Sequence, residues 1–174
     1  MSLRIGLRFV ATALALCASG ALASAQNKIA VINLQQAVLG SAEIKKASAE
    51  LEAKFKPRAN QIDQLQKDIA NISQQLQSGS GKLSPAAEAD LNAQGQRKQR
   101  DLQRLQEDLQ ADVDRERNEI LSKSTQKMIG VVKKIAEEKG YDAVVDVNNI
   151  VYFKPAMEIT ADAVTEYDKA YPAK

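Results

Sequence analysis

The chain has 174 residues, of which 24 are Lys or Arg, 22 are Asp or Glu, one is Cys and none is His. Without histidine it lacks the usual general base near neutral pH, a Ser-His nucleophile and any His/Cys metal site. Carboxylate pairs such as Glu107-Asp108 fit solvated helix faces better than catalysis. We therefore expect no enzyme activity, no catalytic residue, no metal and no cofactor.

The first 25 residues have the pattern of a cleaved signal peptide. Two arginines are their only charges, an apolar run extends from Phe9 to Ala23, and Ala23-Ser24-Ala25 supplies the small residues of a signal-peptidase site. A membrane anchor is the alternative, but a run of about 15 residues is shorter than the roughly 20 that a bilayer core requires. Cys17 follows a leucine, which argues against a lipoprotein. We expect cleavage after Ala25 and export.

The segment that follows predicts the first part of a small base. Lys28-Ile29-Ala30-Val31-Ile32 has the composition of a short buried strand. Residues 33–39 are expected to form a short helix, which Gly40 ends. We assign residues 26–40 and 140–174 to one β-rich oligomerisation base.

Residues 41–139 predict a long antiparallel helical hairpin. Ser41 is the expected N-cap of a helix to about Gln77, the tip lies near residues 78–84, and Ser84-Pro85 begins a second helix that Gly140 ends. Apolar residues recur in alternating three- and four-residue steps, the period of a helix that packs along a partner. This predicted seam consists of Ile44, Leu51, Phe55, Ile62, Leu65, Ile69, Ile72 and Leu76 in the first helix and of Leu91, Leu102, Leu105 and Leu109 in the second.

Three residues within these helices are candidate hinges. Pro57 removes a backbone hydrogen bond from the first helix, and Gly95 and Gly130 weaken the second. We expect them to let the hairpin bend.

The C-terminal segment predicts the rest of the base. Residues 141–147 and 150–153 have the composition of two strands separated by a turn at Asn148-Asn149, and Thr160 is the expected cap of a helix over 161–170. Three strands and a short helix are too small to cover their own apolar surface. The residues that we expect to form an oligomer interface are Val144, Val145, Val147, Ile150 and Val151.

Charge predicts little about other partners. Without its first 25 residues the chain carries 22 basic and 22 acidic residues, so we expect no nucleic-acid binding. A basic cluster on the second helix could contact anionic lipid, but nearby acidic residues favour a solvated, ion-paired face and only weak contact. The cluster consists of Arg97, Lys98, Arg100 and Arg104.

Taken in order, the signal peptide, Lys28–Asn33, the hairpin, Gly140–Asp146, Ile150–Phe153 and Glu158–Val164 resemble the Skp (OmpH) family of periplasmic chaperones. The resemblance covers essentially the whole mature chain. It implies an α+β fold, in which a coiled-coil tentacle stands on a small trimerisation base. It also implies a homotrimer whose tentacles surround a cavity and hold unfolded outer-membrane proteins in the periplasm without ATP.

Two expectations qualify this resemblance. Well-studied members are strongly basic, whereas residues 41–139 carry 18 Lys+Arg and 16 Asp+Glu, so no lipopolysaccharide site is carried over. A structural coiled-coil scaffold or spacer of the cell envelope, without client binding, is the alternative function, because it too needs a hairpin and an oligomeric base. The sequence alone also leaves open a small oligomer other than a trimer.

Overall fold

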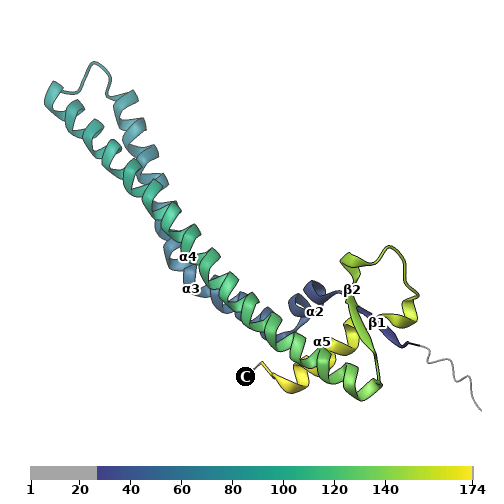
Figure 1. Ribbon diagram of the computed structural model, residues 1–174. Helices are drawn as coiled ribbons and strands as arrows, with labels where there is room; N and C mark the ends of the chain where they lie inside the picture. The colour runs from purple at the N-terminus through teal and green to yellow at the C-terminus, as the bar shows by residue number, and fades with distance from the viewer. Residues whose placement is uncertain (1–26, 174) are drawn as a thin grey trace, which may run out of the picture.

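A computed structural model describes residues 27–173, so the predicted signal peptide lies outside the described part of the chain. A long helical hairpin projects from a small base that both ends of the described chain build together (Figure 1). The predicted α+β class, with its long hairpin and small strand element, is confirmed. None of the described helices is long and apolar enough to cross a membrane.

The hairpin consists of α3 (Ala42–Ser78) and α4 (Pro85–Lys139), and α4 continues past α3 into the base (Figure 1). The side-chain oxygens of Ser41 and Ser84 accept the backbone N–H three residues farther on, as N-caps do. Gly140 ends α4 in the left-handed conformation, with φ of 64°, which glycine adopts without steric cost. These three cap predictions are confirmed.

The sheet of the base has two parallel strands, β1 (Ile29–Ile32) and β2 (Ala143–Asp146). Two parallel strands need a long crossover connection, and in this protein that connection contains the whole hairpin. On the other edge of β1, Val31 forms an isolated bridge with Glu158, and the N–H of Ile159 donates to the Val31 carbonyl at 2.9 Å. β1 therefore lies between two segments from the C-terminal end of the chain.

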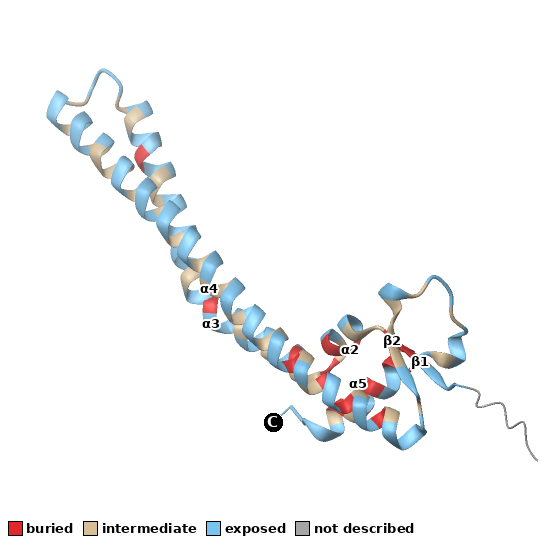
Figure 2. Cartoon of the chain, viewed as in Figure 1, coloured by how far each residue is buried: buried red, intermediate tan, exposed pale blue. Residues whose placement is uncertain are grey.

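Helices α2 (Leu34–Gly40), α5 (Thr160–Ala170) and the last part of α4 enclose the main core against this sheet. Figure 2 shows that most buried residues lie in the base and few along the hairpin. The buried cluster consists of Ala30, Ile32, Ala37, Val38, Ile44, Met128, Val131, Ile135, Ile159, Ala163 and Tyr167.

The predicted strand over Ile150–Phe153 is wrong. A 3-10 turn at Val147–Asn149 precedes it, and Val151 is fully exposed in an irregular loop. The Asp146 carboxylate accepts the backbone N–H of Asn148 at 2.9 Å and so begins the turn immediately after β2. No strand among residues 27–173 lies beside this loop to pair with its backbone.

Two smaller predictions in the base also need correction. The strand predicted over 141–147 is limited to β2. Thr160 does not cap α5: its hydroxyl accepts the Asn33 N–H at 2.9 Å and lies 3.0 Å from the Glu158 carboxylate, to which it donates. A tertiary hydrogen bond has replaced the local one, because it satisfies the partly buried backbone N–H of Asn33.

Candidate functional site

The predicted seam residues lie along the facing sides of α3 and α4. Ile44, Phe55 and Ile72 are buried, and the other nine are half-buried. Of the two residues that interrupt the apolar pattern in α3, Ser48 is exposed and Arg58 is half-buried. A seam this narrow leaves most of the hairpin surface in contact with solvent.

Ion pairs join the two helices on either side of the seam. Lys54 pairs with Glu116 at 2.5 Å, and Lys98 pairs with Asp68 at 2.7 Å. Arg58 contacts Asp112, and the hydrogen bonds from Arg58 and Arg115 hold the pKa of this carboxyl below its ordinary value. Such pairs contribute little stability at a surface, but their positions favour one register of the two helices.

The basic cluster of α4 is partly neutralised. Lys98 contacts Asp68 on α3, and Arg104 contacts Asp101 at 3.3 Å on its own helix. Arg97 and Arg100 are exposed and form no ion pair within residues 27–173. Weak contact with anionic lipid stays a prediction.

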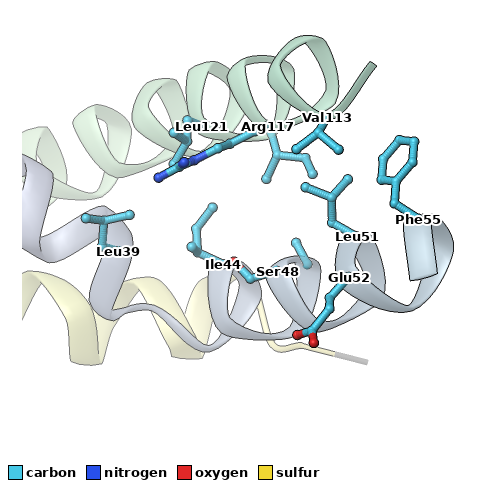
Figure 3. Close-up of a pocket in the computed structure, with 11 residues that line it drawn as sticks. Leu39, Ile44, Ser48, Leu51, Glu52, Phe55, Val113, Arg117 and Leu121 are labelled. Carbon is cyan, nitrogen blue, oxygen red and sulfur yellow. The ribbon is translucent and has the colours of Figure 1, made fainter. Parts of the chain in front are cut away.

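A hollow of about 340 Å³ opens between α3 and α4 where the hairpin meets the base. In Figure 3, Ile44, Ser48 and Leu51 of α3 point toward Val113 and Leu121 of α4 across this space. Sequence reasoning assigned several of these residues to the seam but missed the hollow. The feature of the sequence that could have predicted the hollow is Ser48, a small polar residue at a position where the seam otherwise has a large apolar side chain.

A second hollow, of about 450 Å³, adjoins the first on the side of the base. Leu39, Arg117 and Leu121 line both hollows. Asp146 and Asn148 line the far end of the second, beside the turn that follows β2. We call the two hollows together the root groove.

A partly buried hydrogen-bond network at the hairpin root was also missed. Glu43 at the start of α3 contacts the Lys127 ammonium on α4 at 2.6 Å and accepts the hydroxyl of Tyr167 on α5 at 2.6 Å. Burial alone raises the pKa of the Glu43 carboxyl, but these hydrogen bonds and the Lys127 charge outweigh it and lower the pKa below 4.5. Burial and the bond to Glu43 raise the pKa of Tyr167. The network ties three helices together.

The five residues predicted for oligomerisation do not form one strand. Val144 and Val145 are half-buried in β2, Val147 and Ile150 are half-buried around the 3-10 turn, and Val151 is fully exposed. Val144 packs against the main core, so part of its apolar surface is already covered. Their role in oligomerisation stays a prediction.

The candidate hinges all lie inside continuous helices. Pro57 is exposed on α3, and Gly130 is exposed on α4 with open space where a Cβ would lie. Gly95 faces the seam, where an added Cβ would come within 3.5 Å of Ile72. Their role as hinges is not tested by these positions.

Among residues 27–173, no group of His, Cys, Asp or Glu side chains could hold a metal ion. The root groove and the half-buried seam are therefore the features of the described residues that a functional proposal has to explain.

The model of the family described as outer membrane protein (OmpH-like) matches residues 28–167. The Chaperone protein Skp of Pectobacterium atrosepticum is 30% identical over 153 residues, which cover 86% of this chain and 90% of that protein. The Chaperone protein Skp of Yersinia enterocolitica is 30% identical over 157 residues, covering 88% and 92%. A solved OmpH-like structure from Caulobacter crescentus CB15 shares the fold, with a TM-score of 0.70, 19% identity and coverage of 84% and 86%.

Proposed function

The chain belongs to the OmpH-like family of outer membrane proteins, and on that premise we propose that it is a chaperone. The observation that carries this proposal is the match to proteins named Chaperone protein Skp over almost their whole length. A hairpin standing on a base, with no metal cluster among the described residues, supports a role in binding other chains. The resemblance of the sequence to the Skp (OmpH) family implies the same chaperone role.

In finer terms, the protein holds unfolded outer-membrane proteins in the periplasm without ATP. Its hairpin walls present half-buried apolar residues beside polar ones, so each contact with a client is individually weak. Many weak contacts together hold a chain well, because each further contact forms at high effective concentration. Release then needs no nucleotide.

We further propose that three copies associate through their bases and that the three hairpins surround a cavity. The two-stranded sheet and the exposed loop around Val151 and Tyr152 support this assembly, since both leave apolar surface uncovered in a single chain. Pro57, Gly95 and Gly130 are proposed as places where the hairpins bend to fit clients of different size. Cleavage of residues 1–25 would release the protein into the periplasm.

An aggregation assay tests the proposed function. An unfolded outer-membrane barrel protein is diluted from urea into buffer without ATP, with or without the mature chain, and light scattering is followed. We expect the mature chain to suppress the scattering at near-stoichiometric concentration. Equal scattering with and without it would favour the alternative, a structural scaffold of the envelope that binds no client.

A further inference from the structure

We propose that the root groove is a subsite for one class of client segment: an extended stretch with alternating apolar side chains and a carboxylate between them. The inference deepens the proposed chaperone function and rests on it. It depends on the apolar walls of the groove, on a cation without a partner, and on the length of the groove.

The walls of the groove come from three helices and from the turn after β2, and those of the hollow nearest the seam are mainly apolar. Leu39 belongs to α2, Ile44 and Leu51 to α3, and Val113 and Leu121 to α4 (Figure 3). Leu39 remains 44% exposed, although leucine is usually covered in a folded chain. The hollow nearest the seam has a volume within the range of ordinary ligand sites.

Two departures from the apolar pattern create the space. Ser48 fills too little of a seam position on α3, and Arg117 interrupts a stripe on α4. Val113 and Leu121 lie four residues before and after Arg117, so all three share one face of that helix. The methylene stem of Arg117 can pack in this stripe, but its charged guanidinium group needs water or an acidic partner.

Arg117 has no ion pair within the described residues, unlike Arg58 and Arg115 on the neighbouring turns. The two carboxylates that line the groove do not serve it. Glu52 points away from α4 in Figure 3, and Asp146 accepts the backbone N–H groups of Leu34 and Asn148. The charge of Arg117 is therefore complementary to a carboxylate on another chain.

The length of the groove fits an extended segment. Residues that line it on α4 run from Val113 to Thr125, a span of about 18 Å at about 1.5 Å per residue. An extended strand covers this span with about five or six residues and directs every second side chain to the same face. Strands of outer-membrane barrels have this alternation. Apolar side chains would then enter both hollows, with Arg117 between them.

Peptide binding to the full mature chain tests the subsite. The probes are two capped, fluorescein-labelled nine-residue peptides that alternate Leu, Val and Tyr with Ser and Thr and differ only in a central Glu or Lys. Fluorescence anisotropy measures their Kd values. We expect the Glu peptide to bind about fivefold more tightly, which is what a partly exposed ion pair contributes.

Three variants complete the experiment. Arg117→Gln should abolish the preference for the Glu peptide, whereas Arg100→Gln, at another exposed arginine of the same helix that lies outside the groove, should retain it. Ser48→Leu should fill the hollow, raise the melting temperature and weaken binding of both peptides at least threefold. An unchanged preference in Arg117→Gln, or unchanged binding in Ser48→Leu, would overturn the subsite.

Other occupants give different results. A change of molecular mass in Arg117→Gln would assign the groove to a second copy of the chain and overturn the proposal. Displacement of both peptides by anionic phospholipid vesicles would assign the groove to a lipid surface and would also overturn it. The aggregation assay separates the two levels of inference. If the wild-type chain fails to suppress aggregation, the chaperone proposal fails; if it succeeds while the variants bind peptide like wild type, only the subsite fails.

Discussion

The hairpin and the base of this protein are held together differently. Between residues 51 and 112 the buried apolar side chains are Phe55 and Ile72, and the helices meet through a half-buried seam flanked by ion pairs. The base encloses a continuous core that includes Met128 and Tyr167, both fully buried. The hairpin therefore keeps apolar contacts near solvent, while the base hides them.

The two regions also differ in which parts of the chain they join. In the base, the Asn33 N–H donates to Thr160, and the Ala42 N–H donates to Asp168, at separations of 127 and 126 residues. In the hairpin, ion pairs such as Lys98–Asp68 join residues much closer in sequence. This contrast matches the proposed division of roles, in which the base provides stability and assembly and the hairpin contacts other chains. Four experiments would test this difference between the two regions.

Removal of residues 51–112, which form most of the hairpin, should separate assembly by the base from client binding by the hairpin. We expect a protein in which a short Gly-Ser linker replaces residues 51–112 to fold and assemble but to lose all suppression of aggregation. Both partners of the seam leave together, so no unpaired apolar helix remains. Sedimentation and the light-scattering assay measure the two properties, and a truncated protein that still suppressed aggregation would refute a client cavity between the hairpins.

A charge at Val151 should release monomers. Val151 is fully exposed in the single chain, so Val151→Asp leaves the fold of that chain intact. An unpaired charge buried between copies costs several kcal/mol. We expect the mass from light scattering to fall to that of one chain, whereas Ser80→Asp at the hairpin tip should leave it unchanged. A native mass for Val151→Asp would place the interface elsewhere.

Loss of the Tyr167 side chain should destabilise the base more than an equivalent change destabilises the hairpin. Tyr167→Ala leaves a cavity in the core, with an expected cost of about 3–5 kcal/mol. Leu65→Ala, at a half-buried seam position, should cost about 1–2 kcal/mol. Urea unfolding followed by circular dichroism measures both. Tyr167→Phe keeps the ring and should cost only about 1 kcal/mol, for the bond to Glu43. Equal costs for Tyr167→Ala and Leu65→Ala would contradict the comparison.

Replacement of Pro57 should show whether the hairpin bends there. A proline inside a helix costs up to about 3 kcal/mol, so we expect Pro57→Ala to raise the melting temperature. If Pro57 is a hinge, the distribution of distances between hairpin tips should also narrow. Pulsed spin-label spectroscopy with cysteine at Ser80 measures it, because residues 26–174 contain no cysteine of their own. An unchanged distribution would leave Gly95 and Gly130 as the candidate hinges.

Features that depend on near neighbours could be predicted from the sequence. Caps at Ser41, Ser84 and Gly140 and the strand at Ile29–Ile32 were predictable, because helix ends, glycine turns and short apolar runs depend on residues within a few positions. The three- and four-residue spacing likewise predicted which side of each long helix turns inward, from Ile44 to Leu109. The apolar spacing was easy to recognise because it repeats over many turns of two long helices.

The tertiary structure alone decided what happens where distant segments meet. Residues 150–153 have the composition of a strand, but a strand needs a neighbouring backbone, and β1 pairs with β2 and Glu158 instead. Thr160 could cap its own helix, yet its hydroxyl satisfies the partly buried N–H of Asn33, 127 residues away. The root groove has the same origin: Arg117 and Ser48 are ordinary helix residues in sequence, and only the packing of α2, α3 and α4 places them around one space. Such contacts depend on three-dimensional proximity, which no short window of sequence contains.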